Sequence, residues 1–406
     1  MASIFSRHGM REVNSEQVLR AILREGPLAR VDLAQRVGLT AAAISNITRG
    51  LIENGLLCEV GIARGGRVGA HAILLDLPED TPVIGTVHQG VSALRIALCN
   101  LRGRVLARRS IATPERYTPA WASATIAQTL RELLHTQGYT DEAVVGIGAG
   151  LVGLVDVHHG VVKRAPSLGW EDVPFGNLLE EQLHHPVAIE NNVRAMAFGE
   201  ALLGEGRAWS DFAFVYIGTG IGAGLIINGR PYRGAHGGAG EIGHITVDPI
   251  GEICSCDNRG CLETVAAEPA IIRSARSRGI ELDTSGGKSK EAVRTLATLA
   301  RMGDEVAHEV VKNCGESLGV GLANLVDIFN PGRIVLHGAI TGAGEVFSSS
   351  VTHCLRQHAF LTKDESIELV APTFGDDAGL VGATAVALDA IVLSGRMREG
   401  AKVGAA

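Results

Sequence analysis

Short amphipathic segments separated by turn residues make up the first eighty residues. Apolar side chains recur at helical spacing over 15–24 and 30–37, and a third apolar pattern covers 41–54. Gly38 provides a tight turn after the second segment, and Thr40 is a favourable N-cap for the third. A helix, a glycine turn and a capped helix together predict a helix-turn-helix unit.

The pattern changes from helical to alternating after the third segment. Residues 57–61 and 72–77 read as two strands, and the Arg64–Arg67 stretch between them, Arg-Gly-Gly-Arg, reads as a loop tip. A hairpin in this position is the wing of a winged helix-turn-helix. The sequence therefore predicts a winged helix-turn-helix domain over 1–80.

From about residue 82 to 389, buried strands alternate with helices. We expect strands within 82–106, 143–156, 187–190, 211–217, 224–227, 334–337 and 367–370. We expect helices over 118–134, 191–203, 267–277, 290–301, 304–328 and 379–393. This alternation in two halves predicts an α/β body with two lobes. Residues 395–406 have no apolar periodicity and read as a loose tail.

Charge is distributed unevenly along the chain. The net charge is −7, but residues 1–70 hold nine Arg against six Asp or Glu, which gives +3 there and −10 in the remainder. A mildly basic head on an acidic body suits a protein of which only the head meets phosphate. Aromatic residues are only 4% of the chain, which argues against single-stranded nucleic acid binding by base stacking.

Neither a membrane span nor a secretion signal is evident. No apolar run reaches the ~18–20 residues that cross a bilayer, and the first residues lack an apolar signal core. These features predict a cytoplasmic protein without membrane partners.

One stretch, 237–264, carries metal-ligand chemistry. His244, Cys254, Cys256 and Cys261 form an H-x9-C-x-C-x4-C series, and three thiolates with one imidazole suit a closed tetrahedral zinc site. The other four cysteines are scattered singly, as expected of reduced core thiols. The sequence therefore predicts zinc as a cofactor.

Candidate DNA contacts lie on the third predicted helix and on the wing. Its N-terminal half would enter the major groove, where Ser and Asn side chains can hydrogen-bond base edges and small alanines allow close approach. Arg49, Arg64 and Arg67 are suited to phosphate or minor-groove positions. The predicted DNA-binding residues are Thr40, Ala42, Ala43, Ser45, Asn46, Arg49, Arg64 and Arg67. A small helical domain that only binds protein or dimerises is the alternative.

The zinc stretch also carries a family resemblance. Its GEIGH segment at 240–244 and the C-x-C-x3-GCLE segment at 254–263 resemble the signature of the ROK family of bacterial sugar-responsive repressors and sugar kinases. The resemblance extends from about residue 14 to 389. It implies an actin-like ATPase body with the ligand in the cleft between lobes. Lobe 1 would cover 81–200, completed by a helix at about 379–394, and lobe 2 would cover 201–378.

Two positions distinguish this chain from the kinases of that family. The resemblance places His88 where a kinase has the Asp of its phosphate-binding loop, and Asn192 where it has the Asp that acts as general base. An amide has no useful basicity, so Asn192 cannot accept the proton of a sugar hydroxyl in the transition state. A glycine-rich element at 218–224 remains and could cradle phosphate or simply permit close packing. We therefore expect a kinase fold without enzymatic activity.

The resemblance also implies a sugar pocket. Its members are carboxylates, amides, an imidazole and a hydroxyl, which can pair with the hydroxyl groups of a sugar: Asn191, Asn192, Glu241, His244, Glu263 and Ser167. His244 would bind zinc with one ring nitrogen and the sugar with the other, which makes the zinc structural. Trp170 is either a lid over this pocket or a core residue.

The functional hypothesis is a sugar- or sugar-derivative-responsive transcriptional regulator, a repressor of carbohydrate metabolism genes. Its partners would be a double-stranded DNA operator, a small sugar effector and further copies of the chain in a dimer or tetramer. Two alternatives stay open: an ATP-dependent sugar kinase with a fused DNA-binding domain, and a zinc-sensing regulator.

Overall fold

The protein is described by a computed structural model over residues 7–62, 72–114, 116–360 and 367–397. The chain divides into two compact units. Unit 1 is formed by Met1–Arg207 together with Asp376–Ala406, and unit 2 by Ala208–Gly375. Unit 1 is therefore built from two separate stretches of chain. Within the stretches described, no helix combines the length and apolar character required to cross a membrane.

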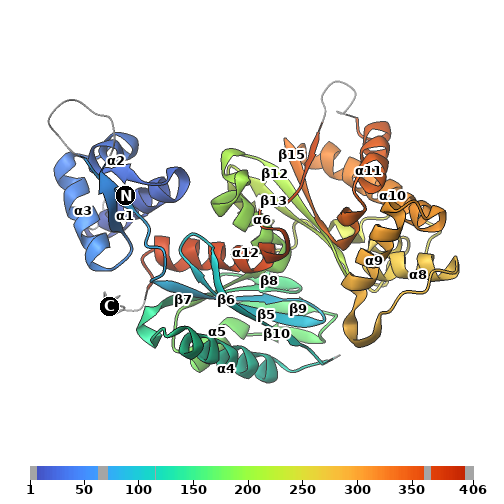
Figure 1. Cartoon of the computed structure of the whole chain (residues 1–406), viewed down its shortest axis with the longest axis horizontal. Coiled ribbons are helices and arrows are strands. Elements are labelled where there is room, and N and C mark those ends of the chain that lie inside the picture. The colour runs from blue at the N-terminus through green and yellow to red at the C-terminus, as the bar shows by residue number, and fades with distance from the viewer. Residues whose placement is uncertain (1–6, 63–71, 115, 361–366, 398–406) are drawn as a thin grey trace. The chain divides into compact units, whose positions relative to one another are not determined.

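The head of unit 1 contains three helices and a small antiparallel sheet (Figure 1). Its elements are α1 (Arg7–Glu25), β1 (Leu28–Ala29), α2 (Arg30–Val37), α3 (Ala41–Glu53), β2 (Cys58–Ile62) and β3 (Ile73–Asp76). The sheet order is β1-β3-β2, so β2 and β3 form the predicted hairpin. Its tip, with Arg64 and Arg67, lies outside the described residues. The predicted winged helix-turn-helix fold is confirmed.

Local chemistry explains the head's turns. Gly38 ends α2 in the left-handed conformation with φ +68°, which glycine adopts without steric cost. The Thr40 hydroxyl then caps α3 by accepting a hydrogen bond from the Ala43 N–H at 3.2 Å. The core beneath these turns is apolar and includes Ile22, Leu33 and Ile44, each fully buried. Helix α1 begins eight residues before the predicted position, because its first turns lack the apolar periodicity on which that prediction rested.

A five-stranded sheet forms the body of unit 1, in the order β11-β7-β4-β5-β6. The strands are β4 (Val83–Gln89), β5 (Ala93–Asn100), β6 (Val105–Ala112), β7 (Val144–Leu151) and β11 (Val187–Asn191). Strands β4, β7 and β11 run parallel, whereas β5 and β6 are added as antiparallel neighbours. Because these three strands are parallel, the C-terminal ends of β4 and β11 lie on the same side of the sheet.

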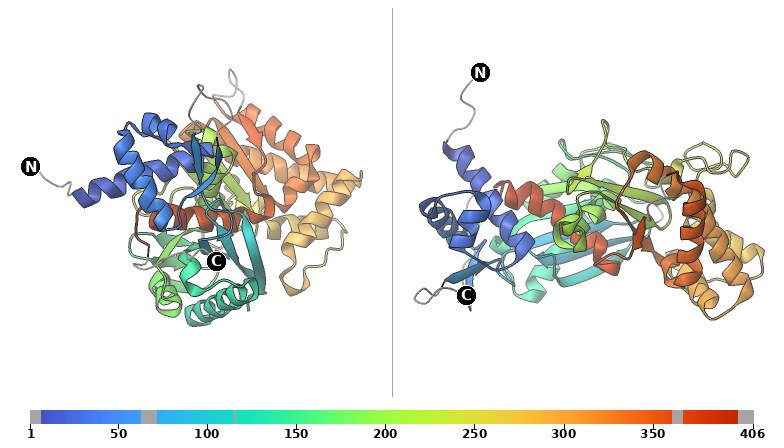
Figure 2. Two further views of the ribbon diagram at one scale, coloured as in Figure 1. Left: turned by 60° about the vertical axis from the view of Figure 1, so that its left-hand side comes forward. Right: turned by 90° about the horizontal axis from the view of Figure 1, so that it is seen from above.

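Helices cover both faces of this sheet (Figures 1 and 2). On one face lie α4 (Pro119–Gln137) and α5 (Phe175–Leu183), and on the other lie α6 (Asn192–Leu203) and α12 (Ala378–Ala387), which continues as the π-helical turn η8 (Leu388–Leu393). A small sheet of order β10-β9-β8 is attached, with β8 (Leu154–Asp156), β9 (Val161–Ala165) and β10 (Trp170–Val173). The shorter turns are η1 (Asp141–Ala143) and η2 (Glu205–Ala208).

The single strand predicted over 143–156 is two strands in the structure. Gly153, with φ +95°, interrupts it between β7 and β8, and its Cα lies so close to the Arg164 backbone that a Cβ would overlap the carbonyl oxygen. The apolar run continues through the break, which is why periodicity alone did not reveal it.

A second five-stranded sheet, of order β14-β13-β12-β15-β16, forms the centre of unit 2. Its strands are β12 (Phe212–Ile217), β13 (Ile221–Ile227), β14 (Arg230–Tyr232), β15 (Arg333–Gly338) and β16 (Glu368–Val370). The helices of the unit are α7 (Glu263–Ala266), α8 (Glu268–Ser277), α9 (Ser289–Arg301), α10 (Glu305–Phe329) and α11 (Glu345–His358). Single helical turns occur at η3 (Ile242–His244), η4 (Ser285–Gly287), η5 (Ala339–Ala343) and η7 (Gly375–Asp377). The two mixed sheets with their helices confirm the predicted α/β fold.

Candidate functional site

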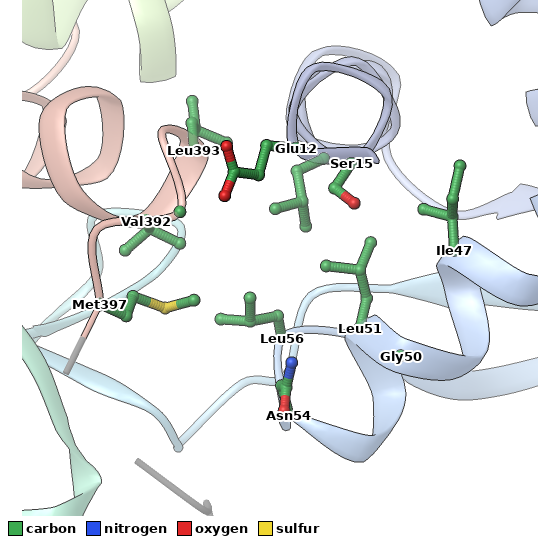
Figure 3. A pocket seen from close by; sticks show the side chains of 12 residues that line it. Glu12, Ser15, Ile47, Gly50, Leu51, Asn54, Leu56, Val392, Leu393 and Met397 are labelled. Atoms are coloured by element: carbon green, nitrogen blue, oxygen red, sulfur yellow. The ribbon is translucent and has the colours of Figure 1, made fainter. Parts of the chain in front are cut away.

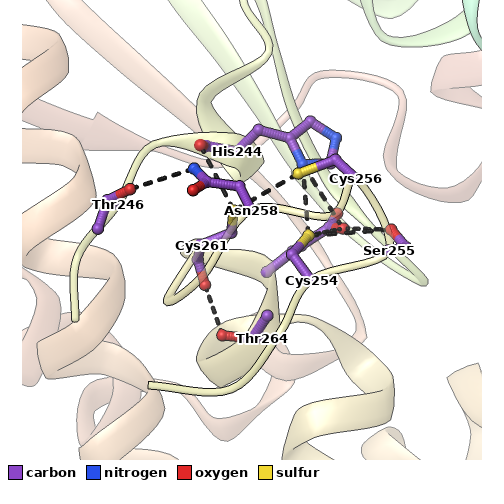
Figure 4. A network of polar contacts seen from close by, with 9 residues as sticks. His244, Thr246, Cys254, Ser255, Cys256, Asn258, Cys261 and Thr264 are labelled. Atoms are coloured by element: carbon purple, nitrogen blue, oxygen red, sulfur yellow. Dashed lines mark hydrogen bonds and ion pairs between the residues drawn. The ribbon is translucent and has the colours of Figure 1, made fainter. Parts of the chain in front are cut away.

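The predicted metal ligands converge in the loop between η3 and α7 of unit 2 (Figure 4). His244 ends η3, and Cys261 lies two residues before α7. The loop is closed by backbone bridges, among them the Thr246–Cys261 pair and the Val247 N–H to Gly260 oxygen bond of 2.8 Å. Gly260 has φ +68° and lies directly against the Asp248 backbone, so any side chain there would collide. Glycine at this position is therefore required for the loop to close.

The geometry of the cluster fits a tetrahedral zinc ion. One donor atom from each of His244, Cys254, Cys256 and Cys261 can be chosen so that all four lie within 4.8 Å of one another. The His244 Nδ1 and Cys254 Sγ are 3.6 Å apart, and the Cys256 and Cys261 sulfurs are 3.8 Å apart. Ligands at about 2.3 Å from a tetrahedral zinc would be separated by about 3.8 Å. The Nδ1 contact leaves the Nε2 atom of His244 for another partner.

The surroundings of the three thiols shift their pKa values in different directions. Burial raises the pKa of Cys254 to about 12, and burial raises the pKa of Cys261 as well. At Cys256 the backbone hydrogen bond from Asn258 lowers the pKa. Zinc binds thiolates, so burial at Cys254 and Cys261 opposes the ionised form that a zinc site uses. A bound zinc ion would supply the positive charge that holds all three as thiolates.

Glu263 is packed against this cluster. Its Oε1 accepts hydrogen bonds from the Cys254 Sγ and the Ser255 Oγ, both at 3.1 Å, and lies 3.7 Å from His244 Nδ1. Its Oε2 borders the β12–β13 turn, where a Cβ on Gly220 would come within 3.1 Å of it. Glu241 immediately precedes η3 and is exposed. Of the predicted sugar-binding residues in unit 2, the structure brings His244 and Glu263 into contact.

In unit 1, the predicted residues Asn191 and Asn192 form the junction between β11 and α6. The Asn191 side-chain oxygen caps α6 by accepting from the Val193 and Arg194 N–H groups at 3.0 and 3.1 Å, and its amide donates to the Gly153 oxygen at 3.0 Å. The Asn192 oxygen accepts from Val193 N–H at 2.9 Å. Both amides are half-buried and fixed in orientation.

Ser167 lies on a different loop of unit 1 from these two amides. It lies in the exposed turn between β9 and β10, which is closed by the Leu168 N–H to Ala165 oxygen bond of 3.0 Å.

A buried ion pair beneath the junction was missed by sequence reasoning. Glu190 and Arg194 are each 1% exposed, and the Arg194 Nε lies 2.9 Å from the Glu190 Oε1. The same carboxylate oxygen accepts from the Asn191 N–H at 2.8 Å. Acid and base four residues apart across a strand–helix boundary were the available signal, but such spacing is usual on exposed helices.

A second polar group missed by sequence reasoning is centred on Gln89, at the end of β4. Its amide donates to the Tyr117 hydroxyl at 3.1 Å, and its oxygen accepts from the Val152 N–H at 3.1 Å. The Trp170 indole donates to the Tyr117 carbonyl oxygen at 3.0 Å, and Trp170 is only 4% exposed. Burial raises the pKa of Tyr117 to about 12, so its hydroxyl stays protonated. Of the two alternatives for Trp170, the structure supports the core residue.

His88 and Glu268 are two further buried titratable groups. His88, on β4, is 6% exposed and packs against Gly379 near the start of α12. Glu268 is 4% exposed at the start of α8, where its N–H donates to the Gly218 oxygen at 2.8 Å. Burial raises the pKa of Glu268 to about 7, because Lys290 and Arg294 offset only part of the desolvation.

The head presents a polar surface on α3. Thr40, Ala42, Asn46 and Arg49 are exposed, and Ala43 and Ser45 are half-buried. Ser45 donates its hydroxyl hydrogen to the Ala41 oxygen at 2.8 Å, which leaves its lone pairs as acceptors. Ile44, Ile47 and Leu51 face inward and hold the helix against the head core. The exposed residues are thus available on one side of a fixed helix.

Comparison with known proteins identifies the family. The model of the ROK family matches residues 84–390. A putative xylose repressor from Caldicellulosiruptor sp. (strain Rt8B.4) is 30% identical over 386 residues, which cover 93% of this chain and 96% of that protein. The DNA-binding transcriptional dual regulator NagC from Escherichia coli K12 is 32% identical over 384 residues, which cover 93% and 92%.

Solved structures give the same result for the fold. A ROK family transcriptional regulator described as a homolog of the E. coli MLC protein superposes with a TM-score of 0.81 at 29% identity, covering 96% of this chain and 98% of that one. A ROK family glucokinase from Streptomyces griseus, solved with glucose and AMPPNP, superposes with a TM-score of 0.63 at 28% identity. That match covers 98% of the glucokinase but 74% of this chain.

Proposed function

The chain belongs to the ROK family, and from this premise we propose that it is a DNA-binding transcriptional repressor whose DNA affinity is controlled by a sugar or sugar derivative. The observation that carries the proposal is the extent of the match to named regulators, which spans 93% of the chain and so includes the head as well as the body. Carbohydrate metabolism genes are the proposed targets, and the cytoplasm is the proposed location.

We propose that α3 enters the major groove of an operator. Its exposed Asn46 and Arg49 lie three residues apart on one helical face, as base and phosphate contacts require. The full proposed set is Thr40, Ala42, Ala43, Ser45, Asn46, Arg49, Arg64 and Arg67. A symmetric dimer would place two heads on half-sites about one DNA turn, or a multiple of it, apart. A tetramer built from two such dimers would satisfy the same spacing.

The proposed effector is recognised by hydroxyl-binding side chains. The candidates are Glu241, His244 and Glu263, together with Asn191 and Asn192. The Nε2 of His244 suits a sugar hydroxyl because its Nδ1 faces the thiols. In this scheme zinc is structural and holds His244 and Glu263 in register. Ser167, in the exposed turn between β9 and β10, completes the proposed set.

We propose further that the body has no sugar kinase activity. Phosphoryl transfer relies on positioning and on charge stabilisation. The family's kinases use the carboxylate of an Asp as the proton acceptor. Here Asn192 stands at that position, and its side-chain oxygen already accepts a hydrogen bond from Val193 N–H. His88 stands in place of the phosphate-loop acid and packs against Gly379.

The experiment measures operator binding by fluorescence anisotropy, using duplexes selected in vitro with this protein. Xylose, N-acetylglucosamine, glucose and their phosphates are then added singly. We expect one of them to weaken operator binding by about tenfold or more. Asn46→Ala should relax base preference at a cost of about 1–3 kcal/mol, whereas Arg49→Ala should weaken all duplexes and lower the salt dependence. A protein that selects no duplex, or whose binding no sugar changes, contradicts the proposal.

The kinase alternative is favoured by the likeness to the glucokinase structure. It is tested with the same sugars by coupling ADP release to a dehydrogenase assay. The proposal expects no sugar-dependent ADP release, and Asn192→Asp alone should not create it, because His88 is also changed. Sugar-dependent ADP release by the natural protein would establish the alternative.

A further inference from the structure

Helices α6 and α12 in unit 1 are joined by a seam of small residues. A Cβ added to Gly199 would lie 2.9 Å from the Gly382 Cα, and one added to Gly382 would lie 2.5 Å from the Ala195 carbonyl carbon. All ten residues of α12 are buried, as are residues 193–201 of α6. Backbones this close cannot rotate or slide past each other without collision. The two helices therefore move as one block.

One end of this block carries the amide junction. Asn191 caps α6, and the buried pair of Glu190 and Arg194 fixes that cap from below. The pair is 1% exposed on both sides, so a shift of Asn191 that keeps the pair intact must carry the first turn of α6 with it. Any change at the junction is thus applied to the whole block.

The other end of the block meets the head. Asp389, in the η8 turn that continues α12, forms an ion pair with Arg20 of helix α1. Arg20 also pairs with Glu16 on its own helix, with Nε and Oε1 2.8 Å apart. Both side chains of the Arg20–Asp389 pair are about one quarter exposed, which shields the pair partly from water. This ion pair links the head to the helical block.

The packing around this link is incomplete. A cavity of about 310 Å³ lies between the head and the end of the last helix (Figure 3). Leu19, Leu51 and Leu56 line it from the head, and Val392 and Met397 line it from the C-terminal side. A cavity removes dispersion contacts that would otherwise hold two surfaces in one arrangement. The joint is therefore less tightly packed than the interface between α6 and α12.

We infer that the α6–α12 block couples the Asn191–Asn192 junction to the orientation of the head, and that the Arg20–Asp389 pair is the coupling contact. The inference rests on the proposed function, because it assigns the route by which the effector end and the DNA end communicate. Arg20 and Asp389 act in this scheme as positioning residues. Coupling between two sites is reciprocal, so DNA bound to the head must alter the junction just as a ligand at the junction alters the head.

This reciprocity permits a test that does not require the effector to be known. Hydrogen–deuterium exchange is measured on the full chain, with and without a duplex selected in vitro for binding. The reporters are the Val193 and Arg194 amides, which donate to the Asn191 cap. We expect DNA to change their exchange rates by about five- to tenfold in the natural protein. In Asp389→Asn the change should fall below about twofold, a loss typical of broken coupling.

Matched variants separate coupling from general effects. Arg20→Gln removes the other partner and should give the same loss, whereas Asp172→Asn, which breaks an exposed pair with Lys163 in the same unit, should leave the DNA-induced change intact. Duplex binding without any change at the two reporter amides overturns the inference but not the proposed function. An equal change in Asp389→Asn and the natural protein overturns it as well. Failure to bind any duplex overturns both.

Discussion

Two turns of this protein hold polar side chains in place by different means. In unit 2, His244 and Glu263 are held by a loop whose ligand atoms converge as if around an ion, while its apolar residues Ile250 and Ile253 stay 89% and 68% exposed. In unit 1, Asn191 is held by a helix cap above the fully buried Glu190–Arg194 pair. The first turn leaves these apolar side chains exposed and carries a ligand set that fits zinc, whereas the second supplies its own counter-charge.

The largest expected effect is on the metal-binding loop of unit 2. Cys256→Ser removes one of four ligands from a site whose zinc binding free energy is about 10 kcal/mol or more. We expect the zinc content to fall well below one per chain and the 245–262 amides to lose their exchange protection. The Val193 and Arg194 amides of unit 1 should keep theirs. Metal analysis and hydrogen exchange measure both, and Cys58→Ser, in the head, is the control. Unchanged zinc content in Cys256→Ser would rule out the assigned ligand set.

The next largest effect is on the buried Glu190–Arg194 pair of unit 1. Arg194→Met leaves the Glu190 carboxylate buried without its partner, which should reduce the free energy of unfolding by about 3–5 kcal/mol. Urea unfolding measures this loss, and a chelator should not change it. Arg273→Met disrupts an exposed pair with Glu252 and should cost less than about 1 kcal/mol. Equal costs for the two variants would show that burial of the Glu190–Arg194 pair contributes nothing.

A third effect concerns Glu268. Unlike Glu190, it is a buried acid that makes no ion pair among the described residues. The folded state raises its pKa from 4.5 to about 7, so between these values the folded chain binds more protons than the unfolded one. Stability contributed by the neutral acid is present below pH 4.5 and is lost as the pH rises through 7. Glu268→Gln should therefore raise stability at pH 8 by on the order of 2–3 kcal/mol, with little effect at pH 4.5.

Urea unfolding at the two pH values measures the contribution of Glu268. Glu171→Gln makes the same substitution at an exposed acid on β10 of unit 1, which is not among the charges acting on Glu268, and serves as the control. A Glu268→Gln gain that is the same at both pH values would mean that ionisation of the acid is not its cause.

The smallest effect is expected at the turn before α3, where the Thr40 side chain caps the helix without a metal ligand or a buried ion pair. Thr40→Ala removes the side-chain acceptor for the Ala43 N–H and should cost the head about 1 kcal/mol. Thr40→Ser keeps the acceptor and should recover most of it. Thermal unfolding followed in the head, for instance by exchange of the α3 amides, measures the difference. A loss as large as that of Arg194→Met would mean that Thr40 does more than cap α3.

Local chemistry was readable from the sequence. The ligand spacing of His244, Cys254, Cys256 and Cys261 predicted the cluster, because a metal loop is specified by residues that are close in sequence. Helix α2 occupies the predicted 30–37, and α3 ends one residue before the prediction, because caps and glycines near each end define them. The ion itself and the roles proposed for the sugar- and DNA-binding residues stay predictions.

Long-range pairs were not readable in the same way. Arg20 and Asp389 are 369 positions apart, and nothing in either segment marks the other as its partner. Gln89 and Tyr117 meet only because β4 ends beside the segment that precedes α4. The burial of Glu190 and Arg194 likewise depends on α12 covering α6, which is a property of the assembled unit. Sequence patterns specify the elements, and packing decides which polar side chains lose water.

The last helix has a consequence for synthesis on the ribosome. Unit 2 is one continuous stretch, Ala208–Gly375, whereas the unit 1 sheet lacks its α12 cover until residues 378–387 have been translated. During translation, Gly148 and the apolar side of α6 therefore lack their packing partner, α12, while more than 160 residues of unit 2 are made. Newly made chains would therefore be most prone to aggregation late in elongation, and a nonsense codon just before α12 would release a product in which unit 2 is complete and unit 1 is not.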